Sequence, residues 1–112
     1  MAVSDRTWHE VFDRDNGCCR YCGEDLLLSI SRYRSAEVDH LLPVEHSDRD
    51  AVEHLVLSCG PCNKSLNSVR ARRLTTFDSR KSFLQSSVHQ VGYLRKYQEH
   101  LEKRIARNLG EG

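Results

Sequence analysis

Two groups of residues in this chain of 112 residues have the types and spacing that chemistry requires. The first is AEVDHLLPVEHS, residues 36–47, which places the carboxylate of Asp39 beside the imidazole of His40 and adds His46 six positions later. Imidazole changes its protonation near neutral pH, and a carboxylate is a natural ligand for a hard metal ion. The pair therefore suggests proton transfer beside a metal, although Asp-His pairs are also common in surface turns and helix caps.

Four of the five cysteines form the second group, as two C-x-x-C pairs. Cys19 and Cys22 lie in CRYCG, and Cys59 and Cys62 lie in CGPCN. Four thiolates hold Zn²⁺ tetrahedrally and leave no position for a substrate, so the zinc that they predict is structural. It would close a loop of 36 residues between the pairs, at an entropy cost that metal binding can offset. A disulfide framework or a redox C-x-x-C is the alternative, and the remaining Cys18 is expected to be a packed side chain.

The N-terminus favours zinc over disulfides, because MAVSDRTWHEVF lacks the apolar core of a signal peptide. No apolar run in the sequence is long enough to span a membrane. Disulfides persist in oxidising compartments, whereas thiols in the cytosol stay reduced. We therefore expect a cytoplasmic protein that has no contact with a membrane.

The charge of the chain is unevenly distributed, although the total is only +1. Residues 1–63 carry six Lys or Arg and twelve Asp or Glu, a net charge of −6, whereas residues 64–112 carry eleven and four, a net charge of +7. The basic half begins directly after the second cysteine pair with NKSLNSVRARR, which contains Lys64, Arg70, Arg72 and Arg73. These four residues are candidates for contacts with nucleic-acid phosphates, and the alternative is a solvated basic face.

Periodicity and caps predict the elements that position these groups. Ser4 or Thr7 can cap a first helix, which Asn16-Gly17 ends. Strand-like runs follow around Ile30 and over 38–44, and a helix is expected from about Pro61. Apolar residues recur every three or four positions through the C-terminal segment, which predicts one long helix whose apolar stripe packs on the body of the domain. A dimer seam is the alternative use of that stripe.

Taken in order, WHEVFDRDNGCCRYCG and EVDHLLPVEHSDRDAVEHLVLSCGPCNKSLNS resemble the HNH endonucleases with two zinc-binding C-x-x-C knuckles. The resemblance covers about residues 8–70. It implies an α+β fold with a small, zinc-stabilised ββα-metal core of treble-clef type. Residues 1–112 are then a single domain, with a helix before the core and a helical extension over about 79–108.

The resemblance also implies a role for each residue of the motif. His40 would be the general base that activates water for hydrolysis of a DNA phosphodiester bond. Asp39 and Asn63 would bind one catalytic Mg²⁺ or Mn²⁺. Hydrolysis would leave 3′-hydroxyl and 5′-phosphate ends on the DNA. The second motif position falls on His54, where the family usually has an asparagine that orients the base. Imidazole offers fewer donors than a carboxamide, so this departure puts the orienting role of His54 in doubt.

Several features remain open at the level of sequence. The alternative function is a zinc-stabilised nucleic-acid-binding or interaction module that lacks cleavage activity because of His54. His46 and Asn67 are weaker candidates for a substrate contact or a further ligand. Double-stranded DNA is the expected partner, with RNA as the alternative. A bacterial or phage-type origin, a partner protein that chooses the target, and a monomer or a homodimer are all compatible with the sequence.

Overall fold

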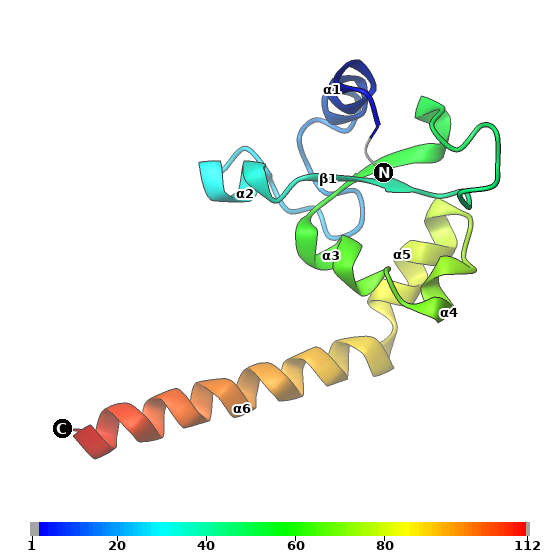
Figure 1. Ribbon diagram of the computed structural model, residues 1–112. Coiled ribbons are helices and arrows are strands. Elements are labelled where there is room, and N and C mark those ends of the chain that lie inside the picture. The colour runs from blue at the N-terminus through cyan, green and yellow to red at the C-terminus, as the bar shows by residue number, and fades with distance from the viewer. Residues whose placement is uncertain (1–2, 112) are drawn as a thin grey trace.

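The computed structural model describes residues 3–111, apart from the side chains at 69–70, 87–89 and 111. Its elements follow in the order α1 (Asp5–Arg14), α2 (Ile30–Arg34), β1 (Glu37–His40), the 3-10 helix η1 (Val52–His54), β2 (Leu55–Ser58), α3 (Gly60–Ser65), α4 (Val69–Arg72), α5 (Phe77–Gln85) and α6 (Ser87–Glu111). Figure 1 shows a body that contains the elements up to α5, from which α6 extends away. The fold is α+β, with a two-stranded sheet and a long C-terminal helix, as the sequence predicts.

The two strands and α3 form a ββα unit. β1 and β2 pair antiparallel, with Glu37 opposite Ser58 and His40 opposite Leu55. All four residues of β2 are buried, so this strand runs through the core. Cys59 follows β2 directly and caps α3, because its Sγ accepts a hydrogen bond from the backbone N–H of Cys62 at 3.4 Å. The second cysteine pair therefore lies at the junction of strand and helix.

α1 packs against β2 through an apolar face that is centred on Val11 and Phe12. Ser4, one of the two expected caps, is the N-cap, since its hydroxyl accepts a hydrogen bond from the N–H of Thr7 at 3.2 Å. The helix ends where Asn16 and Gly17 adopt positive φ angles of 57° and 66°, which confirms the predicted stop. A Cβ at Gly17 would also lie 3.0 Å from the side chain of Leu27, so this position requires glycine for two reasons.

Two predictions about local structure between the cysteine pairs are wrong. The expected strand around Ile30 is the short helix α2, because the hydroxyl of Ser29 caps it and accepts a hydrogen bond from the N–H of Arg32 at 3.1 Å. The second strand ends at His40 and does not continue to Val44. Pro43 lacks a backbone donor, and the chain turns here into the loop 41–51 that leads to η1.

The C-terminal segment forms two helices in place of the single helix that was expected. Ser86 has an extended conformation, with φ −60° and ψ 142°, and separates α5 from α6. Leu84 of α5 is buried, but the large apolar residues in the described part of α6 are exposed, so the expected packing of the stripe on the body is wrong. Within residues 3–111, no helix is both long and apolar enough to cross a membrane.

A buried carboxylate ties α1 to β2 and to the first cysteine pair. The side chain of Asp15 is only 2% exposed, and it accepts hydrogen bonds from the N–H of Leu57 at 2.9 Å and from Arg14 at 2.8 Å. Arg20 adds a third contact at 3.1 Å. Burial acts to raise the pKa of Asp15, but the hydrogen bonds from Arg14 and Leu57 and the two positive charges outweigh it, so the pKa is lowered.

We expect Asp15→Asn to lower the free energy of unfolding by about 1–3 kcal/mol at pH 7, because a buried charged acceptor is lost. An acid with a lowered folded pKa stabilises above its unfolded pKa, and that stability is lost as the pH falls through the folded value. The difference in the free energy of unfolding between wild type and Asp15→Asn should therefore be largest above about pH 5 and should shrink below about pH 4. Urea denaturation over this range measures it. A difference that does not depend on pH would contradict this role for the carboxylate.

Candidate active site and zinc centre

The four paired cysteines converge on one point of the fold. The Sγ atoms of Cys19, Cys22, Cys59 and Cys62 all lie within 4.8 Å of one another, and those of Cys22 and Cys59 are 3.8 Å apart. A tetrahedral ion with Zn–S bonds of about 2.3 Å separates its sulfur ligands by about 3.8 Å, so the set fits zinc. Cys18 lies outside the cluster, is partly buried, and forms a β-bridge with Asp25 through its backbone.

The cluster is held rigidly on one side. Cys19 and Cys59 are almost fully buried, whereas Cys22 is exposed. The thiols of Cys59 and Cys62 donate to the sulfur of Cys19 and lower its pKa, which favours a thiolate at that position. The backbone N–H of Arg20 also donates to the carbonyl of Leu57 at 2.9 Å. This hydrogen bond joins the first knuckle to β2 independently of the metal.

His40 lies at the end of β1 with a carboxylate beside it. Its Nε2 is 2.8 Å from Oδ1 of Asp50, and its side chain is 15% exposed whereas that of Asp50 is 56% exposed. An acceptor at Nε2 favours the tautomer with the proton on that nitrogen and leaves the lone pair of Nδ1 available. His40 is therefore held in the form that can accept a proton at Nδ1. Sequence reasoning missed Asp50, since nothing distinguishes it from Asp48 in the polar loop EHSDRD.

Asp39, directly before His40, is buried and has two partners. The hydroxyl of Tyr21 donates to its Oδ2 at 2.5 Å, and Nη1 of Arg80 lies 3.3 and 3.4 Å from its two oxygens. Burial raises the pKa of Asp39, and the hydrogen bond from Tyr21 and the charge of Arg80 oppose that shift. The positive charge of Arg80 compensates the carboxylate, since an unpaired buried charge would be costly.

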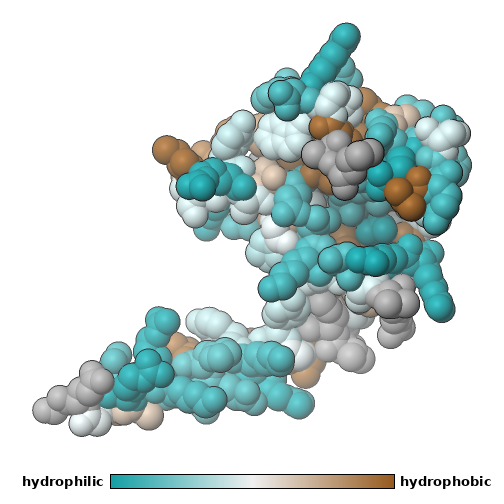
Figure 2. All heavy atoms as spheres, in the orientation of Figure 1, coloured by the Kyte–Doolittle hydropathy of each residue, from teal (hydrophilic) through white to brown (hydrophobic). Residues whose placement is uncertain are grey.

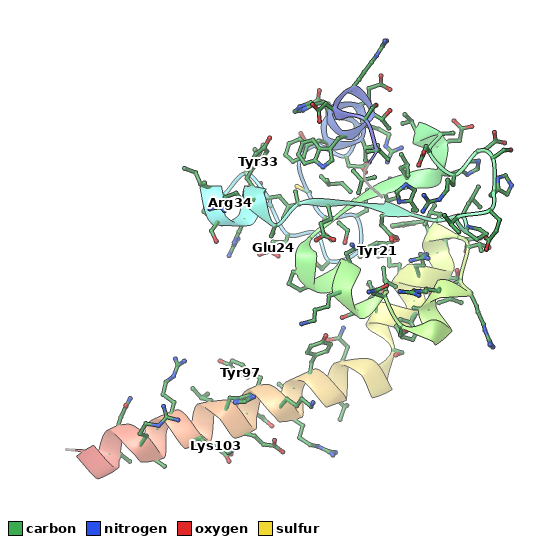
Figure 3. The ribbon with its side chains drawn as sticks, viewed as in Figure 1. Tyr21, Glu24, Tyr33, Arg34, Tyr97 and Lys103 are labelled. Atoms are coloured by element: carbon green, nitrogen blue, oxygen red, sulfur yellow. The ribbon has the colours of Figure 1, made fainter. Side chains whose placement is uncertain are left out.

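Arg80 reaches Asp39 from α5, far along the chain. Its Nε donates to the carbonyl of Leu74 at 2.9 Å, and the residue is 5% exposed. Phe77 in the first turn of α5 stacks on Tyr21 with ring centroids 5.3 Å apart, and Figure 3 shows Tyr21 between β1 and α5. No signal in the sequence singles out Arg80. Tyr21 could have been noticed, because it lies inside the first knuckle.

Asn63, in α3, lies against β1 through its side chain. Its terminal amide is in hydrogen-bonding contact with the carboxylate of Glu37, with the nitrogen as donor in the assigned orientation. Glu37 and Asp39 are two residues apart on a strand, so their side chains leave the same face of β1. The structure thus brings Asn63 and the two carboxylates to one side of the strand, and Glu37 is a further residue that sequence reasoning missed.

These groups line one open pocket with a volume of about 1150 Å³. All four residues of β1 contribute to it, because in the described part of the chain β1 pairs only with β2 and its other edge is open. Asn63 also lines the pocket, and basic side chains complete the wall: Arg49, Lys64, Arg72 and Arg80. Histidine, oxygen donors and fixed positive charges therefore meet in one cavity.

The other histidine of the motif is placed differently. The ring of His54 contacts that of His46, with centroids 6.4 Å apart. Its backbone carbonyl accepts a hydrogen bond from the N–H of Leu41 at 3.0 Å, which extends the pairing of the hairpin by one residue beyond His40. Neither ring is among the residues that line the pocket. His54 therefore braces the chain next to His40 through its main chain.

The candidate phosphate-binding residues are only partly brought together. Lys64 and Arg72 line the pocket, and Arg73 is exposed outside it. The side chain of Arg70 lies outside the described part of the chain. Asn67 is a hydrogen-bond acceptor for Arg72, whose Nε lies 3.2 Å from its Oδ1, so this asparagine orients a basic side chain at the pocket wall.

Residues 19–68 match a family model described as HNH endonuclease. This segment of the chain is similar to HNH endonucleases. The matched segment contains both cysteine pairs, β1, β2 and α3, and the match supports a nuclease-type function in general. Comparisons with curated proteins and with solved structures give no match. Asp15 and Arg80, which contact Leu57 and Asp39 of the matched segment, lie outside the matched residues themselves.

Removal of zinc should destabilise the fold strongly, because the four thiolates join segments that are distant in sequence. We expect one zinc per chain by elemental analysis and its loss in Cys19→Ser, with a fall in melting temperature of about 15 °C or more. Cys18→Ser is the matched control, since it lies outside the cluster. Full zinc content in Cys19→Ser, or its loss in Cys18→Ser, would contradict this assignment.

Proposed function

We propose that this chain is a metal-dependent endonuclease that hydrolyses phosphodiester bonds of double-stranded DNA, with His40 as the general base. The observation that carries the proposal is the pairing of Asp50 with His40, which lines the same pocket as Asp39 and Asn63. A general base needs a free lone pair, a fixed orientation and access to water, and these residues supply all three.

His40 takes the proton from the attacking water at Nδ1. Asp50 accepts the hydrogen bond from Nε2–H, fixes the plane of the ring and stabilises the positive charge that the ring acquires. Because Asp50 is more than half exposed, part of this electrostatic effect is screened by water. Asp50 acts through His40 and is therefore a positioning residue.

The oxygen donors on the other face of β1 suit a hard cation such as Mg²⁺ or Mn²⁺. Asp39 and Asn63 would hold it, and the contact between Asn63 and Glu37 brings a further carboxylate to the same place. When bound, such an ion neutralises charge on the phosphoryl group and the leaving oxygen. Tyr21 and Arg80 fix the carboxylate of Asp39 in position from the buried side.

Basic side chains along the pocket account for binding of the DNA backbone. Lys64 and Arg72 would contact phosphates on either side of the bond that is cut, with Arg73 and Arg70 further along the same basic segment. Such contacts release counterions, so binding should weaken steeply as the salt concentration rises. The carboxylates at the site do not oppose DNA binding, because Asp39 would bind the metal ion and Asp50 accepts a hydrogen bond from His40.

The first experiment is cleavage of supercoiled plasmid by zinc-loaded protein in Mg²⁺ or Mn²⁺. We expect His40→Ala to lower the rate at least about 100-fold, since a general base contributes that much or more. Zinc content and DNA affinity should not change. His100→Ala, an exposed histidine on α6, is the matched control.

Two results would overturn the proposal. Cleavage that survives in His40→Ala would remove this residue from the chemistry. Wild-type protein that is folded, zinc-loaded and bound to DNA, yet does not cut in either metal, would favour a binding module that has no cleavage activity.

We expect Asp50→Ala to lower the cleavage rate about 10-fold to 100-fold while DNA affinity stays the same, because only the orientation and tautomer of His40 change. ¹⁵N NMR of the imidazole should show mainly the Nε2–H tautomer in the wild type and a mixture in Asp50→Ala. Asp48→Ala in the same loop is the control. An unchanged tautomer together with a reduced rate would refute the positioning role.

A further inference from the structure

The helix α6 carries an apolar stripe that the body does not cover. Five of its residues, at positions 91, 94, 101, 105 and 109, are large and apolar, and their exposed fractions run from 39% at Leu101 to 77% at Leu109. At 3.6 residues per turn these five positions fall within a sector of about 80° around the helix axis. The face of α6 turned to the viewer in Figure 2 is mainly hydrophilic, with hydrophobic side chains at its edges.

Among the described residues, two side-chain contacts join the body to α6 near the start of the helix. Gln90 donates through its Nε2 to the carbonyl of Leu84 at 2.6 Å, and the hydroxyl of Tyr93 lies 2.9 Å from Oγ of Ser65. On the helical wheel both contacts lie to one flank of the stripe. Beyond its start α6 extends away from the body, as Figure 1 shows, and the residues of the stripe are exposed, so the stripe is open to another molecule.

We propose that the stripe binds the same stripe of a second copy, so that two α6 helices pack antiparallel about a twofold axis at Gln98. This register places Val91 opposite the partner's Ile105, and Leu94 within one residue, about 1.5 Å along the helix axis, of the partner's Leu101. Every large apolar residue between positions 91 and 105 of the stripe then meets another one, and Gln98 meets its own copy at the axis. An isologous pair of this kind is closed at two chains.

The charges beside the stripe match this antiparallel register. Arg95 and Glu102 lie on the same flank, and around the axis at Gln98 each Arg95 comes within one residue of the level of the partner's Glu102, close enough for the two side chains to pair. Because they are seven residues apart, the two side chains are about 10 Å apart along one helix and do not pair within it. In a parallel pair of α6 helices, Arg95 would instead face the other flank of the partner's stripe. That flank carries Arg104 and has no acidic residue over 93–108. Lys96 and Lys103 lie on the face opposite the stripe.

Charge reversal on the full-length, zinc-loaded chain tests the proposal by sedimentation equilibrium. We expect the wild type to dimerise with rising concentration, and Arg95→Glu or Glu102→Arg alone to raise the dimer dissociation constant about 10-fold, because two symmetric pairs become repulsive. The double variant R95E/E102R should restore dimerisation. Lys103→Glu on the opposite face is the matched control, and circular dichroism checks that α6 remains helical.

Three outcomes would overturn the proposal. The wild type could stay monomeric at 100-fold above the concentration used for the cleavage assay. Arg95→Glu and Lys103→Glu could weaken the dimer equally, which would indicate net charge and not pairing. The double variant could also fail to recover while its helix content is intact. None of these readouts depends on cleavage, so the proposal can fail or hold independently of the proposed function.

Discussion

Everything at the candidate site depends on the closure of one loop by four sulfur atoms. The two cysteine pairs are separated by 36 residues, and that loop carries β1, the histidine at its end and the whole of β2. Where the second pair closes it, Cys59 also begins α3, so Asn63 is fixed relative to β1 by the same contacts that hold the sulfurs. A chain of this size has a small core, and a closed loop compensates for that.

The second constraint is the burial of a negative charge next to His40. Asp39 is held inside the fold only because Tyr21 donates to it and Arg80 lies against it. These two partners come from the first knuckle and from α5, which also stack on each other through Tyr21 and Phe77. The site is thus built from segments before, within and after the hairpin, and α5 belongs to its architecture although its sequence is not part of the motif.

The sequence was sufficient for some of this arrangement, and physical reasons explain the rest. The cysteine pairs, the end of α1 and the strand at Val38 and Asp39 depend on local signals, such as fixed ligand spacing, positive φ at Asn16 and Gly17, and alternation along a short strand. Partners that are brought in from distant segments, such as Arg80 for Asp39, leave no local trace. The break at Ser86 was also missed, since helical periodicity continues through it. The segment at Ile30 forms a helix and not the predicted strand, because Ser29 caps it and its apolar residues are exposed.

The contacts of the buried carboxylates of Asp15 and Asp39 also determine the shortest segment of the chain that could be transferred into another protein with the site intact. A segment cut at the bounds of the family match, 19–68, would keep every motif residue but lose Asp15, which holds the edge of β2, and Arg80, which compensates Asp39. Such a graft would carry an uncompensated buried charge at the strand that bears His40. A fusion or chimera that is meant to transfer this site therefore has to start ahead of α1 and run through α5, while α6 can be exchanged without opening the site.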